Sequence, residues 1–170
     1  MDGTSARRIC FEDLEPGGSP IRSAIGRTVT DADNVWFTCL TMNTNQIHFN
    51  TAYAEDSRFE RPLVNSTLTL ALVTGLTVPD TSQNAVANLG WSEVTLPNPV
   101  FAGDTIWAET RVLEKRLSRS KPALGVVTVR SRGINQDGAV VIEFRRAFMV
   151  PTRAGAAPAR FPEAEREWAA

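Results

Sequence analysis

The stretch RPLVNSTLTLALVTGLTVPD, residues 61–80, decides the fold. From Leu68 to Leu76 it is apolar on nearly every side, and its threonines leave the choice between helix and strand open. Because the apolar run is long and ends at Gly75 and Pro79, we interpret it as a buried helix. A helix without a polar face must be covered by another layer of the protein.

The second half of the chain supplies that layer. β-branched or alternating apolar patterns over residues 106–112, 124–134 and 140–150 predict strands, and residues 87–96 predict an earlier one. The pair Asp137-Gly138 tolerates positive φ and predicts a hairpin turn between the last two strands. Helices followed by antiparallel strands predict an α+β domain with one long helix on a sheet.

The only histidine, His48, lies in the segment TMNTNQIHFN, residues 41–50, which has three asparagines and no carboxylate. Before it, TDADNVWFTCLTM predicts a helix, because Thr30 and Asp33 form a capping pattern and an apolar face follows. After it, NTAYAED at residues 50–56 predicts a second, short helix. His48 is therefore expected in a connection between helices, where functional side chains are common.

Composition excludes several kinds of partner. The 18 basic and 19 acidic residues nearly cancel, so no broad attraction to nucleic acid or to an anionic membrane is expected. One histidine and the two cysteines, Cys10 and Cys39, do not make an ordinary zinc site, and Cys39 is expected in the core. No apolar run is long enough for a signal peptide or a membrane span, so we expect a cytoplasmic protein.

The chain is expected to form one domain with two irregular ends. Residues 1–27 are rich in Gly, Pro and charge and are interpreted as an irregular lead-in. Residues 28–151 form the domain, and residues 152–170 form a tail that Phe161 and Trp168 could hold against it.

Four motifs in this order resemble those of the MaoC-like dehydratases. TMNTNQIHFN and the following RFERPLVNS resemble the hydratase motif, in which an Asp, four intervening residues and a His precede a Phe-x-x-Pro turn and a helix. NPVFAGDT at residues 98–105 and NQDGAVV at residues 135–141 are similar to two later motifs of the family. The resemblance covers about residues 28–151 and looks closest to the mesaconyl-CoA hydratase branch, also called β-methylmalyl-CoA dehydratase.

The resemblance implies a hotdog fold, a sheet wrapped around a long helix, and an enoyl-CoA hydratase that also works as a 3-hydroxyacyl-CoA dehydratase. The implied substrate is a short branched or dicarboxylic acyl-CoA such as mesaconyl-CoA, with coenzyme A as part of the substrate and no cofactor or metal. Family members pair their sheet edges, so a homodimer or higher homo-oligomer is expected.

The resemblance also assigns site residues. His48 matches the catalytic histidine, and Asn43 stands where the family has its catalytic aspartate. The backbone amide of Ser66, at a position usually occupied by glycine, is the implied donor to the thioester oxygen. Histidine suits proton transfer because its side chain titrates near neutral pH, whereas an amide neither takes nor gives a proton there.

A free carboxylate on the substrate would require an arginine or several amide donors. The candidate is Arg61, with Asn65 and Gln46 as uncharged alternatives, and Asn45 is expected beside the substrate as a residue that holds the water. An uncharged residue at position 43 would suit a substrate that itself carries a carboxylate.

Two interpretations of Asn43 stay open at this point. Either His48 performs both proton transfers while Asn43 and Asn45 hold the water, or catalysis is lost and the chain only binds an acyl thioester. A hotdog thioesterase is a third alternative, disfavoured because the predicted helix NSTLTLALVTGL contains no carboxylate or histidine.

Overall fold

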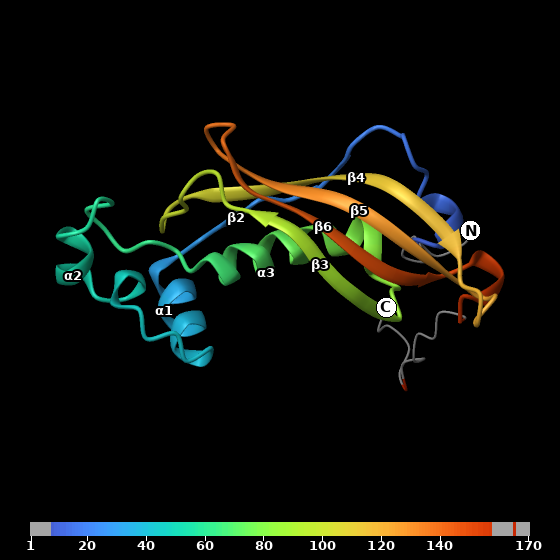
Figure 1. Ribbon diagram of the computed structural model, residues 1–170, viewed down its shortest axis with the longest axis horizontal. Helices are drawn as coiled ribbons and strands as arrows, with labels where there is room; N and C mark the ends of the chain where they lie inside the picture. Colours follow the sequence, from blue (N-terminus) through green and yellow to red (C-terminus); the bar gives the residue numbers. More distant parts are fainter. Residues whose placement is uncertain (1–7, 158–164, 166–170) are drawn as a thin grey trace.

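The computed structural model describes residues 8–157 and residue 165, and in it one curved antiparallel sheet arches over a single long helix (Figure 1). The strand order is β1-β4-β5-β6-β3, and β2 also pairs with β4. The strands are β1 (Ile21–Arg22), β2 (Arg27–Thr28), β3 (Ala87–Thr95), β4 (Thr105–Leu117), β5 (Leu124–Asn135) and β6 (Val140–Pro151). The predicted α+β architecture, with one long helix against an antiparallel sheet, is confirmed.

In the described part of the chain, three α-helices lie on or beside the concave side of the sheet. They are α1 (Asp31–Leu40), α2 (Thr51–Glu55) and the central α3 (Ser66–Thr77). Shorter turns of 3₁₀-helix occur at Phe11–Asp13, Gln46–His48 and Arg153–Gly155. Figure 1 shows α1 and α2 together at the N-terminal end of α3, beyond one end of the sheet.

The central helix runs further than its sequence predicts. Gly75 does not end it, and beyond Thr77 the chain continues as a π-helix over Val78–Ser82 that includes Pro79. Because proline has no N–H to donate, the regular ladder cannot continue unchanged there. The Thr81 hydroxyl instead donates to the Thr77 carbonyl at 2.6 Å, so the wider turn is held by a side chain.

One side of α3 is buried against the sheet and the other side is open. Val73 and Leu76 join the core with β4 and β6 side chains, and the helix approaches β5 so closely that a Cβ at Gly133 would lie 2.6 Å from a Val73 methyl. Thr67, Ala71 and Gly75, four residues apart, are exposed. Among the described residues, the covering layer that the sequence predicted is thus present on one side of α3 only.

The hairpin between β5 and β6 forms as predicted, with Gly138 at φ 80°. The period-two burial of β6 also places Arg146 inside, where its guanidinium donates to Asn88 at 2.7 Å and to Ser82 at 3.1 Å. Burial lowers the pKa of Arg146 from its ordinary value. Through these two bonds, Arg146 of β6 connects the edge strand β3 at Asn88 and the end of the π-helix at Ser82.

The lead-in contains more structure than its composition suggests. Besides β1 and β2 it includes the buried Cys10 and Leu14, and Leu14 packs against side chains of β4, β5 and β6. The tail residues Phe161 and Trp168 lie outside the described residues. No helix in the described part of the chain has the length and apolar character to cross a membrane, and the cytoplasmic location stays a prediction.

Candidate active site

Helix α1 starts as its sequence predicts. The Asp33 amide donates to the Thr30 hydroxyl at 3.2 Å, and the Thr30 amide donates back to the Asp33 carboxylate at 2.8 Å. Burial raises the pKa of Asp33, but hydrogen bonds from Thr30 and Arg27 outweigh this effect, so the pKa lies below its ordinary value. Asp33, the acidic residue near the helix start, therefore serves as part of the N-terminal cap of α1.

The faces of α1 are the reverse of the expected arrangement. Its buried residues are the polar Asn34 and Thr38, whereas Trp36 is 79% exposed and Leu40 is 83% exposed. The prediction that Cys39 lies in the core is wrong for the same reason, since it occupies the outward face. The inward face is polar because it bonds to the loops around His48, and the apolar face has no cover among the described residues.

Asn43 directly follows a tight end of α1. The Met42 and Asn43 amides donate to the carbonyls of Cys39 and Thr38, which is the Schellman arrangement, and Met42 adopts φ 57° where glycine is usual. The Asn43 side-chain oxygen accepts the Asn45 amide at 3.0 Å. This bond turns the chain toward His48 and leaves the side-chain N–H group of Asn43 as the donor available to a water.

His48 is 8% exposed and ends the short 3₁₀ turn Gln46–His48. Its ring Nδ1 lies 2.8 Å from the carbonyl oxygen of Leu63. A carbonyl oxygen only accepts, so Nδ1 carries the hydrogen and Nε2 of the neutral ring carries the lone pair. The fold thus orients the single histidine with one nitrogen bonded to the backbone and the other able to act as a base.

Ser66 is the first residue of α3, three residues after the carbonyl that holds His48. No acceptor for its backbone amide occurs among the described residues, as expected for the first N–H of a helix. Ser66 also lines a cavity of about 240 Å³ whose other walls are mainly apolar and include Leu63, Val64, Thr69 and residues 96–100. An unpaired amide at a helix start, in a residue that lines a largely apolar cavity, is suited to an oxyanion.

The other amide side chains predicted to bind substrate are used locally. Asn65 is 1% exposed and caps α3, with its side-chain oxygen accepting from Thr67 and its N–H group donating to Thr38. The Asn45 oxygen accepts from Ile47 at 3.3 Å, and the Gln46 oxygen accepts from Asn50 at 2.7 Å. Asn45 and Gln46 are exposed beside His48, whereas Asn65 acts within the fold.

The two arginines near the cavity are placed differently. The Arg61 guanidinium lies 3.7 Å from the centre of the Phe101 ring and does not line the cavity, although the sequence analysis selected it as the carboxylate binder. Arg58 does line the cavity, with its guanidinium 4.6 Å from the centre of the Phe59 ring. The two arginines are three residues apart in the sequence, and the structure is needed to show which of them lines the cavity.

Two residues near the site were missed by the sequence analysis. Arg58 has no motif to mark it, and Asn34 resembles any polar residue inside a helix. The signal that was available for Asn34 is its spacing, because Asn34 and Thr38 are four residues apart and share one face of α1. Neither His48 nor Arg61 is among the described residues that line the cavity, and the His48 ring is connected to the cavity wall through its bond to the Leu63 carbonyl.

Comparison with solved structures places this arrangement in a known fold. A Mycobacterium tuberculosis protein with a double hotdog fold superimposes with a TM-score of 0.78 at 21% identity, over 89% of this chain and 46% of that one. The MaoC domain protein dehydratase of Chloroflexus aurantiacus gives a TM-score of 0.83 at 33% identity, over 97% of this chain and 46% of that one. The sheet around α3 is therefore a hotdog fold.

Sequence comparison gives the family. Residues 14–133 match the MaoC like domain, and the mesaconyl-CoA hydratase of Cereibacter sphaeroides is 39% identical over 94% of this chain and 46% of its own length. The chain belongs to the MaoC-like domain family, as the resemblance implied. It spans less than half the length of that hydratase, which is long enough to contain a second unit of this size.

Proposed function

We propose that this chain is the hotdog unit of an enoyl-CoA hydratase that adds water across the C2–C3 bond of an acyl-CoA, or removes it in the reverse direction. One observation supports this above the others: Leu63 O holds the His48 ring with its basic nitrogen free, and the unpaired Ser66 amide begins α3 three residues later. One short segment, Leu63 to Ser66, thereby carries both the carbonyl that orients the base and the amide proposed as the oxyanion donor.

The oxygen of the added water and the proton that it loses each have a partner in this arrangement. Asn43 donates a hydrogen bond to the water, and His48 Nε2 takes a proton from it as its oxygen bonds to C3. The negative charge develops on the thioester oxygen, where the Ser66 amide donates a hydrogen bond. His48 then returns its proton to C2, so that one water has been added and the histidine is neutral again.

This cycle requires no acid at position 43, because one histidine gives and takes the same proton. It also requires no cofactor or metal, since the thioester stabilises the intermediate charge. Loss of the conjugated enoyl absorbance, without release of free thiol, is the expected result when the chain is mixed with a short enoyl-CoA. Release of thiol would instead identify a thioesterase, and α3 carries no carboxylate or histidine for that reaction.

The finer part of the proposal is a substrate with a second carboxylate, bound by Arg58. The cavity beside Ser66 has this cation in a wall that is otherwise apolar or uncharged, and no carboxylate pairs with it among the described residues. A short branched acyl chain fits the apolar part, and a terminal carboxylate fits the guanidinium. The mesaconyl-CoA hydratase relative acts, by its name, on such an acyl group.

Replacing Arg58 by methionine is expected to lower kcat/KM for mesaconyl-CoA about 10- to 100-fold, because a hydrogen bond to a charged group contributes about 1.5–3 kcal/mol. The same change should alter kcat/KM for crotonyl-CoA, which lacks the carboxylate, by less than about threefold. Steady-state kinetics on both substrates makes the comparison.

Arg61→Met is the matched control, since both guanidinium groups stack on phenylalanine rings and both arginines are exposed. It should affect the two substrates alike. A loss confined to mesaconyl-CoA in Arg61→Met, with Arg58→Met unaffected, would return the carboxylate-binding role to Arg61.

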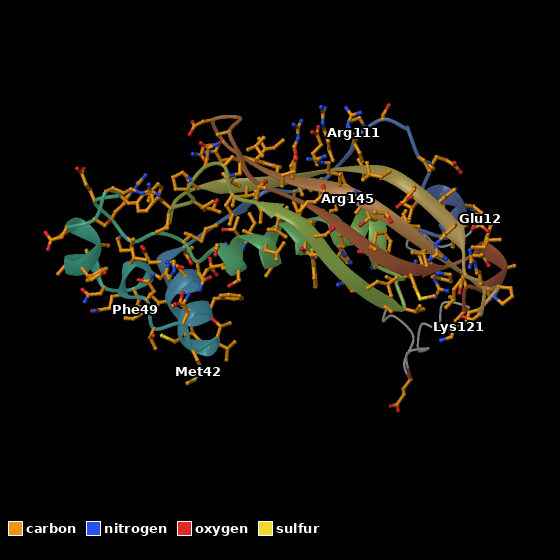
Figure 2. The ribbon with its side chains drawn as sticks, viewed as in Figure 1. Glu12, Met42, Phe49, Arg111, Lys121 and Arg145 are labelled. Atoms are coloured by element: carbon orange, nitrogen blue, oxygen red, sulfur yellow. The ribbon has the colours of Figure 1, made fainter. Side chains whose placement is uncertain are left out.

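We also propose that a second hotdog unit covers the open surfaces, in a homodimer or a larger homo-oligomer. The outward face of α1 is strongly apolar (Figure 2 shows Met42 projecting from its end), and the edge strand β3 exposes Leu89, Trp91 and Val94. Exposed apolar surface of this extent is typical of an interface. The cavity beside Ser66 would then be completed by the second unit.

Light scattering is expected to give at least twice the mass of the 18.6 kDa chain. Trp36→Lys, which places a charge on the outward face of α1, should shift the protein toward the monomer, whereas Arg111→Lys on the outer side of the sheet should not (Figure 2). A wild-type protein of monomer mass would contradict the assembly.

A further inference from the structure

The Asn34 side chain contacts the backbone in both parts of the proposed site. It is 3% exposed on the inward face of α1. Its side-chain nitrogen donates to the carbonyl of His48 at 2.8 Å and to the carbonyl of Leu63 at 3.1 Å. Its side-chain oxygen accepts the backbone amide of Asn65 at 2.9 Å.

These three partners fix how the side-chain amide is turned. Two carbonyl oxygens need donors and one amide needs an acceptor, so the nitrogen must face His48 and Leu63 and the oxygen must face Asn65. Only an uncharged amide supplies two donors and one acceptor in this shape. An aspartate has the same outline but, when ionised, would turn an acceptor toward two carbonyls.

The Leu63 carbonyl is shared between Asn34 and the His48 ring, which lies 2.8 Å from it through Nδ1. Asn34 therefore holds the oxygen that orients the ring, and it also holds the backbone of the residue that carries the ring. The direction of the basic nitrogen of His48 depends on both contacts.

The third contact reaches the other half of the site. Asn65 precedes Ser66, whose amide is the proposed oxyanion donor, so a bond to the Asn65 amide fixes the peptide that leads into the first turn of α3. The Asn34 side chain on α1 thus connects the backbone at His48, the backbone at Leu63 and the start of the central helix at Asn65.

We propose that Asn34 is a positioning residue that sets the orientation of the His48 ring relative to the Ser66 amide. Its role is to maintain the Nδ1–H form of His48 and the alignment of the two groups, without contact with the substrate. This inference rests on the proposed hydratase function for its catalytic consequence, but the state of the histidine ring can be measured without any turnover.

The chain is suited to this test because it contains one histidine. In protein labelled with ¹⁵N at histidine, the two ring nitrogens of a single side chain give one pattern that shows directly which of them carries the hydrogen. The wild type is expected to show the Nδ1–H form at neutral pH. Asn34→Ala and Asn34→Asp are expected to lose it in favour of a mixture with the Nε2–H form.

The kinetic consequence is a lower kcat with little change in KM. A displacement of about 1 Å between reacting groups costs roughly 10²-fold in rate, so we expect kcat of both variants to fall about 10- to 100-fold. Thr110→Val is the matched control, because Thr110 is also a buried polar residue whose hydroxyl bonds to Ser131, but it lies within the sheet. It should lower the unfolding midpoint while leaving the histidine pattern and kcat at wild-type values.

The outcomes separate the two proposals. If the wild type has the Nδ1–H form but does not hydrate an enoyl-CoA, the proposed function fails and the ring pattern of the variants still decides the role of Asn34. Two results would overturn the positioning role. The first is an Asn34 variant that keeps the wild-type ring pattern, and the second is an Asn34 variant whose kcat stays as close to the wild-type value as that of Thr110→Val. Should neither variant fold, rapid solvent exchange of the Asn34 side-chain hydrogens in the wild type would overturn it, because the bonds above require protected hydrogens.

Discussion

Replacement of His48 by alanine is expected to lower kcat for enoyl-CoA hydration about 10⁴-fold. General acid–base catalysis by one side chain contributes roughly 10²–10⁴-fold, and the upper end applies because His48 handles the proton both when water attacks and when C2 is protonated. Asn43 cannot substitute, since an amide does not exchange protons near neutral pH. The measurement is the rate of loss of enoyl absorbance at saturating substrate.

The KM of His48→Ala should stay near the wild-type value, because Arg58 and the apolar wall bind the substrate in its absence. His48→Gln provides a polar control that can still bond to Leu63 but is not a base, and it should be as inactive as alanine. A His48→Ala protein that retained more than a tenth of the wild-type kcat would remove the histidine from the mechanism.

The second large effect is expected from Ser66→Pro, which deletes the backbone N–H proposed to donate to the thioester oxygen. Removal of one oxyanion donor costs about 10²–10³-fold in kcat. The substitution suits the backbone, since proline is favoured at the first position of a helix and Asn65 before it already has ψ 126°. The loss should therefore appear in kcat without a large decrease in the free energy of unfolding.

Ser66→Ala is the control, because it removes the hydroxyl and keeps the amide. Its kcat is expected to stay within a few-fold of the wild type. Equal kcat values for the proline and alanine variants would mean that the Ser66 amide does not stabilise the developing charge, and the oxyanion donor would have to be sought elsewhere.

The sequence was informative where local chemistry and tertiary packing agree. Thr30 and Asp33 form their capping box, and Asp137-Gly138 forms the hairpin turn, because each pattern is satisfied by residues close in the chain. The long apolar run is the central helix, and its burial on one side follows from the alternating strands. His48 lies in the connection that the flanking helix signals predicted.

The sequence was less informative where contacts with another segment of the chain determine which way a side chain faces. Cys39 was expected in the core because it lies in an apolar run, but Asn34 and Thr38 occupy the inward face of α1, where the segments around His48 and Asn65 offer them hydrogen-bond partners. Arg58 and Arg61 are the same residue type three positions apart, but Arg58 lines the cavity whereas Arg61 lies over the Phe101 ring. The spacing of Asn34 and Thr38 places them on one face of α1, but it does not say which partners that face meets.

The central claim is that this chain hydrates an enoyl thioester with an asparagine in place of the family aspartate. The most direct test is the loss of enoyl absorbance when the purified wild type is mixed with mesaconyl-CoA, with crotonyl-CoA as the comparison substrate and without detectable release of free thiol. We expect turnover of both, with the higher kcat/KM on mesaconyl-CoA. A folded protein that binds both thioesters and hydrates neither would contradict the claim, and the chain would then be an acyl-thioester binder.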